Sequence, residues 1–131
     1  DDDYLAILNG LVLPISREFA PDVALVAAGF DGCLGDPCGV GFRLTPNVFG
    51  TCVRALRAQG GVKSGRVAVC LEGGYLPEAV SKGAEACVVA LQQEGGSSGC
   101  PQPEAAKASA AAVAALDSVR SAQARYWACC R

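Results

Sequence analysis

Residues 23–37 read VALVAAGFDGCLGDP. The segment 23–27 is short, continuous and apolar, which is typical of a β-strand that is covered on both faces. A glycine ends it, and Asp31 follows almost at once in a glycine-rich loop. Asp before Gly is ordinary turn chemistry, but a carboxylate at a strand end also suits a hard or borderline cation. Both interpretations of Asp31 stay open at this point, whereas Asp36 before Pro37 is interpreted as a turn residue.

A second buried strand is predicted at 66–71, and a helix from 46 to about 59 lies between the two strands in the sequence. Strand, helix and strand in this order predict a right-handed crossover between parallel strands of an α/β sheet. Two strands are few for such a sheet, which usually holds four or more. We therefore expect the chain to be a portion of a larger α/β fold.

Three further segments complete the predicted organisation. Apolar residues at helical spacing predict a helix over 3–19, which Pro14 should kink. Another helix should run from 77 to about 94. Residues 95–103 read GGSSGCPQP, a composition typical of a linker, and an Ala-rich helix is expected over 104–128.

The composition limits the classes of function. The 131 residues are 51% hydrophobic and 18% charged, as in a globular domain. A net charge of −2 without a basic block argues against a nucleic-acid surface, and no apolar run approaches the ~20 residues of a membrane span. The chain contains no methionine, so we expect it to be a piece of a longer protein. It also contains no histidine, the commonest general base and metal ligand.

Eight cysteines are present, but the sequence contains no CxxC pair. Nothing indicates secretion, so we expect reduced thiols rather than disulfides. Because no CxxC pair exists, a structural zinc site built from cysteines is weakly supported.

The two strand ends give a site hypothesis. Ligands of open α/β sheets bind outside the carboxyl ends of the strands. Asp31 follows the first strand, and Gly73, Gly74 and Tyr75 follow the second, so both groups should lie at one rim. Other interpretations remain open. Tyr75 is alternatively a core tyrosine, and the Gly pair alternatively cradles a phosphate or allows a close backbone approach. Nucleotide binding is disfavoured because the G-x-G-x-x-G pattern is missing.

Several quoted stretches resemble one family. EFAPDVALVAAGFDGCLGDP and GRVAVCLEGGY, followed by EAVSKGAEACVVAL and SAQARYWACC, resemble the C-terminal part of the catalytic domain of zinc-dependent histone deacetylases, most closely class II. The resemblance implies a parallel-sheet, three-layer α/β/α fold of the arginase type. Residues 1–94 would form an incomplete catalytic domain and 95–103 a linker. Residues 104–131 would be a C-terminal helix packed on the same domain.

The resemblance also implies residue roles. Asp31 would be one of three protein ligands of a zinc ion, with the other two, an Asp and a His, upstream of this chain. The Tyr75 hydroxyl would donate to the oxyanion formed on the acetyl carbonyl. Gly73, Gly74 and Cys38 would line a narrow channel for the acyl-lysine side chain.

The implied activity is hydrolysis of acetyl-lysine amides in histones or other proteins, with corepressor proteins as further partners. The resemblance places such an enzyme in the nucleus, the cytoplasm or both, acting in chromatin and transcription regulation. The isolated chain should be inactive. Two alternatives remain: a non-catalytic α/β fragment or pseudoenzyme that binds proteins, and an acetylpolyamine amidohydrolase.

A geometric prediction follows. The strands at 23–27 and 66–71 should be parallel neighbours, and a sheet edge and part of an apolar face should be uncovered. The Asp31 carboxylate and the Tyr75 hydroxyl should face one cavity, within about 10 Å, or two strand spacings.

Overall fold

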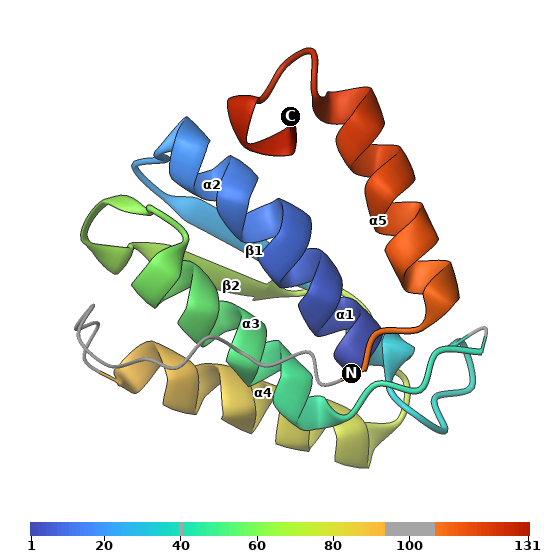
Figure 1. Cartoon of the computed structure of the whole chain (residues 1–131). Helices are drawn as coiled ribbons and strands as arrows, with labels where there is room; N and C mark the ends of the chain where they lie inside the picture. The colour runs from blue at the N-terminus through green and yellow to red at the C-terminus, as the bar shows by residue number, and fades with distance from the viewer. Residues whose placement is uncertain (40, 94–106) are drawn as a thin grey trace.

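The computed structural model describes residues 1–39, 41–93 and 107–131. A layer of helices packs on a small sheet, and one further helix lies beside that layer (Figure 1). The predicted linker 95–103 and the expected helical residues 104–106 lie outside the described residues. The helices of three or more turns and the strands are α3 (Pro46–Gln59), α4 (Pro77–Gln92), α5 (Ala110–Gln123), β1 (Ala24–Ala28) and β2 (Val67–Leu71).

The two strands are parallel neighbours, as the sequence predicts. β1 pairs with β2 from Ala24 opposite Val67 to Ala28 opposite Leu71. The connection between them contains α3, which begins at Pro46 with Thr45 as its N-cap residue. The carboxyl ends of β1 and β2 therefore meet at one edge of the sheet.

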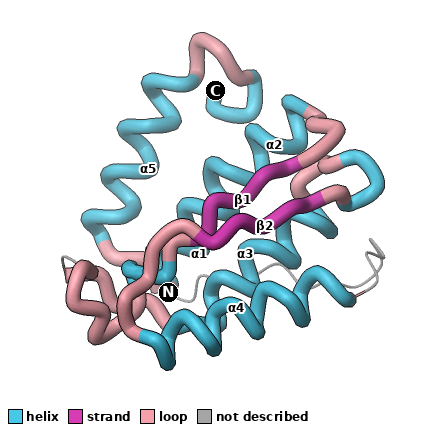
Figure 2. The backbone as a smooth tube through the Cα atoms, turned by 180° about the vertical axis from the view of Figure 1, so that it is seen from behind, coloured by secondary structure: helices cyan, strands magenta, loops and turns pink. Residues whose placement is uncertain are grey.

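Only one face of this sheet is covered within the described residues. Burial alternates along both strands, and Leu25 and Leu71 are 78% and 66% exposed. Seen from behind, the strands lie in front of the helices (Figure 2). The expectation of strands covered on both faces is therefore wrong for this chain, and the expectation of an uncovered apolar face is confirmed. The physical reason is that α3 and α4 supply a single helical layer.

The main core lies between the sheet and that layer. Phe30, just after β1, is 2% exposed, and its ring centroid lies 4.7 Å from that of Phe49 on α3. Gly83 of α4 faces the same ring, where any side chain would collide with it. The close approach of α4 to Phe30 therefore requires glycine at position 83.

The N-terminal helical segment consists of α1 (Asp2–Ile7), a π-helical turn at Leu8–Val12, and α2 (Leu13–Phe19). The sequence predicts a kink at Pro14, and the irregularity takes the form of this π turn just before it. Because Pro14 has no N–H, it cannot donate to the carbonyl of Gly10 four residues earlier. Arg120 of α5 donates to that carbonyl instead, at 3.0 Å. The irregular turn thus provides an attachment point for α5.

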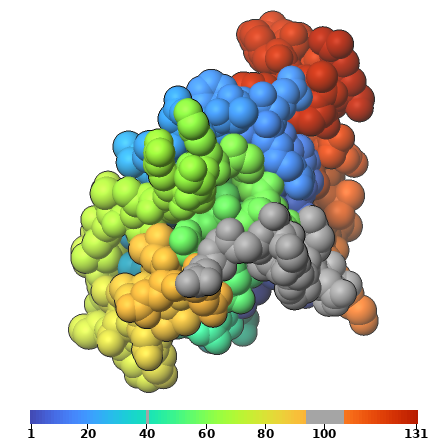
Figure 3. Space-filling model, turned by 90° about the vertical axis from the view of Figure 1, so that its left-hand side faces the viewer, coloured from blue at the N-terminus to red at the C-terminus, as the bar shows by residue number. Residues whose placement is uncertain are grey.

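The C-terminal helix is shorter than predicted. α5 begins after Ser109, whose hydroxyl accepts the N–H of Ala112 as an N-cap, and it ends at Gln123. The chain then turns so that the ring of Trp127 packs edge-on against Phe19 of α2. In the space-filling view the red C-terminal residues lie against the blue helices, far from the yellow residues of α4 (Figure 3). The C-terminal segment thus packs on the N-terminal one.

Two composition-based expectations can be compared with the described residues. The seven cysteines among them are all free thiols, as expected, and Cys70 lies exposed on the uncovered sheet face. Within the described ranges, no helix combines the length and apolar character needed to cross a membrane.

Candidate active site at the carboxyl ends of the strands

The ends of β1 and β2 are joined by backbone hydrogen bonds beyond the last strand residues. The N–H of Glu72 donates to the carbonyl of Ala28 at 3.1 Å, and the N–H of Phe30 donates to the carbonyl of Gly73 at 2.8 Å. The two loops that carry the predicted site residues are therefore held side by side from their first residues.

The backbone of Asp31 is held in place by its buried neighbour Phe30. Residues Phe30–Gly32 form a single 3-10 turn, in which Phe30 is fixed in the core and Asp31 is half-buried at the surface. Cys33 is buried next to it, and burial, followed by the nearby carboxylates of Asp36 and Asp31, raises the pKa of its thiol. Cys33 therefore packs as part of the apolar core beside Asp31.

The Asp31 carboxylate lies directly against Gly73. A β-carbon added at Gly73 would stand 3.0 Å from Oδ2 of Asp31. The neighbouring Gly74 has a φ of +125°, a conformation that other residues rarely adopt. The two positions therefore require glycine for different reasons. At position 73 a side chain would crowd the Asp31 carboxylate, and at position 74 the turn requires a positive φ.

Asp31 and Cys38 share a small pocket of about 150 Å³. It lies between the Phe30–Gly32 turn and the loop that follows it. Its walls come from Tyr4, Gly29, Asp31, Gly32, Cys38, Gly39, Phe42 and Leu44. Sequence reasoning missed Tyr4 and Phe42, because one sits on the predicted N-terminal helix and the other in a loop without a recognisable motif. The structure thus brings two of the predicted site residues together.

Tyr75 is not part of this pocket. Its side chain is 60% exposed, and the residues that line the pocket beside Asp31 do not include it. The backbone part of the geometric prediction is confirmed, since both loops leave the same edge of the sheet. Tyr75 does not line the pocket that Asp31 lines, so this pocket is not the shared cavity that the sequence predicts. The distance between the Asp31 carboxylate and the Tyr75 hydroxyl stays a prediction.

Asp36 does more than the sequence predicts. One carboxylate oxygen accepts the N–H of Cys38 at 2.9 Å, which is the expected turn. The other accepts the N–H groups of Tyr75 and Leu76 at 2.6 and 3.0 Å. Partial burial raises the pKa of Asp36, but these three N–H groups outweigh that effect and hold the pKa below its usual value. No signal in the sequence indicates the contact with Tyr75, which lies 39 positions away.

One described residue of this rim, Asp31, has the chemistry of a metal ligand. Within residues 1–39, 41–93 and 107–131, no three His, Cys, Asp or Glu side chains come together in a way that could hold a metal ion. Asp31, half-buried at a pocket wall, fits the role of a single carboxylate ligand. A site with three such protein ligands would therefore need at least one ligand from outside this described set.

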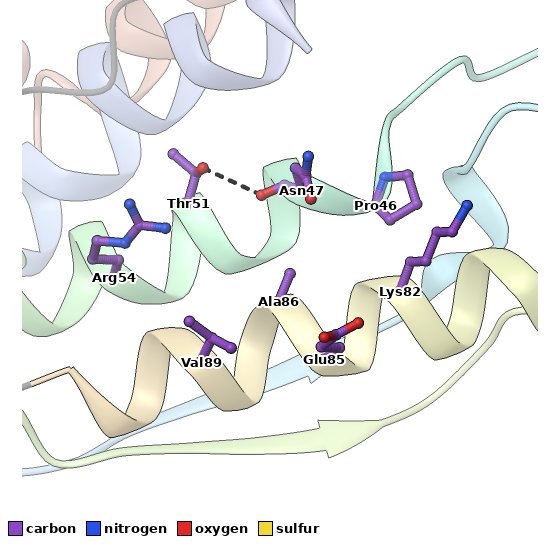
Figure 4. Close-up of a pocket in the computed structure, with 8 residues that line it drawn as sticks. All are labelled: Pro46, Asn47, Thr51, Arg54, Lys82, Glu85, Ala86 and Val89. Carbon is purple, nitrogen blue, oxygen red and sulfur yellow. Dashed lines mark hydrogen bonds between the residues drawn. The ribbon is translucent and has the colours of Figure 1, made fainter.

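A second pocket, of about 590 Å³, lies between α3 and α4 (Figure 4). Arg54 of α3 and Lys82 and Glu85 of α4 line it, together with Pro46, Asn47, Thr51, Ala86 and Val89. The Thr51 hydroxyl donates to the carbonyl of Asn47, and the Lys82 ammonium pairs with Glu78 at 2.7 Å. None of the predicted site residues lies here, so the strand ends remain the candidate site.

Comparisons with known proteins agree with this geometry. The family model described as Histone deacetylase domain matches residues 1–91. The chain is 38% identical over 94 residues to Histone deacetylase 18 of Arabidopsis thaliana, covering 72% of this chain and 13% of that protein. It is 35% identical over 130 residues to Histone deacetylase 4 of Caenorhabditis elegans, covering 97% of this chain and 15% of that protein.

Two solved structures extend the similarity to the fold. The structure of the histone deacetylase Clr3 matches with a TM-score of 0.79 and 33% identity, over 100% of this chain and 21% of that one. The crystal structure of the HDA15 HD domain matches with a TM-score of 0.83 and 32% identity, over 99% of this chain and 34% of that one. The chain has the α/β architecture of these deacetylases and spans about a third or less of each of these four proteins. It therefore belongs to the histone deacetylase domain family.

Proposed function

We propose that the chain forms the C-terminal part of the catalytic domain of a zinc-dependent, class II deacetylase that hydrolyses acetyl-lysine amides in histones or other proteins. The observation that carries this proposal is the rim at the strand ends. There Asp31 lies at a pocket wall against Gly73, two residues before Tyr75. The family membership of residues 1–91 supports the reaction class.

Asp31 would be one ligand of the catalytic zinc. When bound by three protein ligands with a fourth position open, zinc lowers the pKa of its water and polarises the amide carbonyl. The anchoring of Phe30 in the core fixes the backbone of Asp31, so its carboxylate would meet the metal with little reorganisation. The remaining ligands would come from other parts of the domain, because this chain has no histidine.

Tyr75 would stabilise the oxyanion. Its phenol O–H is a hydrogen-bond donor, and the exposed position of the side chain would let the hydroxyl point toward a substrate. A preorganised donor aimed at the developing negative charge typically contributes ~10²–10³ in rate. Gly73 and Gly74 add no side chains beside it, and with Cys38 they would leave room for the acyl-lysine chain.

The substrate and partners belong to the proposal as well. We propose acetylated lysine side chains of histones or other proteins as substrates, corepressor proteins as further partners, and the nucleus, the cytoplasm or both as the location. An acetylpolyamine amidohydrolase is the alternative within the same chemistry. A protein that binds partners without catalysis is the alternative outside it.

The direct test replaces Asp31 by Asn in a deacetylase domain that contains this chain. An amide is a neutral and weaker ligand, so both the zinc content, measured by elemental analysis, and turnover of an acetyl-lysine peptide should fall. Asp22→Asn is the matched control, because that exposed carboxylate pairs with the Lys63 ammonium at 3.2 Å, on the loops at the other end of the strands. Full zinc content and full activity in Asp31→Asn would show that Asp31 is not a zinc ligand and would support its interpretation as a turn residue.

The isolated 131-residue chain provides a second test. With zinc added, it should bind the metal poorly and should not hydrolyse an acetyl-lysine peptide above a buffer control. Turnover by the isolated chain would show that the ligands assigned to other parts of the domain are unnecessary.

A further inference from the structure

We propose that Asp36 is a positioning residue that fixes the backbone on which Tyr75 is carried; this inference rests on the proposed function. From the sequence alone, Asp36 before Pro37 is interpreted as a turn residue only. In the structure its carboxylate bridges the loop after β1 and the loop after β2, which are the two loops that carry Asp31 and Tyr75.

The bridge has a defined geometry. Oδ1 accepts the N–H of Cys38 at 2.9 Å, so Asp36 is itself held by its own loop. Oδ2 accepts two consecutive N–H groups, those of Tyr75 at 2.6 Å and Leu76 at 3.0 Å. Hydrogen bonds to a charged acceptor are shorter and stronger than those between neutral groups. One half-buried carboxylate therefore binds three backbone N–H groups, two of them 39 and 40 positions away in the sequence.

The segment that Asp36 holds needs such a support. Gly73 and Gly74 precede Tyr75 and allow a wide range of backbone conformations. Leu76 is the N-cap residue of α4, yet its side chain offers no acceptor, and Pro77 at the first helical position has no N–H. Asp36 supplies a negative charge before this helix from a distant loop, which the helix dipole also favours. Without it, the N–H groups of Tyr75 and Leu76 would lose the acceptor that the structure gives them.

A positioning role makes a particular kinetic prediction. The Tyr75 hydroxyl would act mainly in the transition state, so a looser Tyr75 should lower kcat and leave KM nearly unchanged. We expect Asp36→Ala to lower kcat by about 10- to 100-fold, as small misplacements of a catalytic group do. Asp36→Asn keeps a carbonyl acceptor but loses the charge, so its kcat should lie between those of Asp36→Ala and the parent. Zinc content should stay the same in both variants.

A double-mutant cycle separates this role from general damage. If Asp36 acts through Tyr75, Asp36→Ala should lower kcat by no more than about 2-fold in a Tyr75→Phe background. An equal loss in both backgrounds, or a loss of zinc, would overturn the inference. Asp22→Ala is the control carboxylate and should leave kcat unchanged.

Amide hydrogen exchange in the 131-residue chain tests the bridge without any activity assay. Asp36→Ala should lower protection at Tyr75 and Leu76 by at least about 10-fold, while the N–H of Phe30, which donates to Gly73, keeps its protection. Unchanged protection at Tyr75 and Leu76 would overturn the bridge. A parent domain without deacetylase activity would overturn the proposed function instead, and the exchange result would still decide whether Asp36 holds this backbone.

Discussion

Two regions of the molecule are held in place by different forces. The sheet with α3 and α4 is joined by a buried apolar cluster around Phe30, Val53 and Cys87. The C-terminal segment from Ser109 onward has one buried residue, Cys130, and is attached chiefly through polar contacts and the Trp127–Phe19 pair. The difference indicates that the strand ends, where the candidate site lies, belong to the rigid region.

Several polar contacts connect the C-terminal segment to the N-terminal helical segment. Asp3 accepts from Ser109, Glu18 accepts the N–H groups of Ala128 and Cys129, and Arg120 donates to the Gly10 carbonyl. Such contacts depend on the charge of the side chains, whereas burial of the apolar cluster does not. The two regions should therefore respond differently to mutation and to pH.

The largest expected effect is in the apolar region. Phe30→Ala removes a ring that is 2% exposed and packed against Phe49, so it should lower the free energy of unfolding by about 3–5 kcal/mol. Urea unfolding measures this change in the free energy of unfolding. Tyr126→Ala, which removes a ring that is 62% exposed, is the control and should cost less than about 1 kcal/mol. Similar losses in the two variants would remove the contrast between the regions.

Arg120→Ala should produce a smaller and more local effect. The guanidinium is partly buried and donates to the carbonyls of Gly10 and Cys129, so its loss should cost about 1.5–3 kcal/mol. Amide exchange should rise in α5 and stay low in α4. The control is Arg125→Ala, whose guanidinium lies over the exposed Tyr126 ring. Faster exchange throughout α4 would show that the two regions unfold together.

Much of the rigid region could be predicted from the sequence. The apolar strand at 23–27, the Thr45–Pro46 helix start and the glycine pair at 73–74 are local signals, and the strands, α3 and their parallel pairing follow from them. The bridge from Asp36 to Tyr75 and the collision of any side chain at Gly83 with Phe30 depend on tertiary contacts. No local pattern reports such contacts, so they could not be predicted.

The C-terminal segment was harder to predict for the same reason. Its alanine-rich composition predicts a helix over 104–128, but in the structure α5 ends at Gln123. Trp127 reaches Phe19, and the Glu18 carboxylate binds the N–H groups that follow. These contacts with α2 replace the last helical turn, and propensity alone contains no information about them.

Acid should loosen the C-terminal segment first, with the smallest energetic effect of the three changes. In the folded chain, hydrogen bonds from Cys129 and Ala128 lower the pKa of Glu18 below its usual 4.5, and those from Ser109 lower that of Asp3 below 3.8. A carboxylate with a lowered pKa stabilises the fold above its unfolded-state pKa. That contribution is lost as the pH falls through the folded-state pKa.

Amide exchange measured from pH 6 downward checks this order. Protection in α5 should decrease once the pH falls below about 4.5. Protection in the C-terminal half of α4, away from Asp36 and the Glu78–Lys82 pair, should persist, since the described residues contain no buried charged side chain in the core. Simultaneous loss in both helices would contradict the comparison.

The central claim is that the rigid rim at the strand ends carries catalytic groups, and Tyr75→Phe tests it most directly. The substitution removes one oxygen from an exposed side chain and should leave the fold and the zinc content unchanged. In a deacetylase domain that contains this chain, steady-state kinetics with an acetyl-lysine peptide should show kcat lowered by ~10²–10³ and KM nearly unchanged. A change confined to KM would make Tyr75 a wall of the substrate channel, and an unchanged kcat and KM would contradict the account.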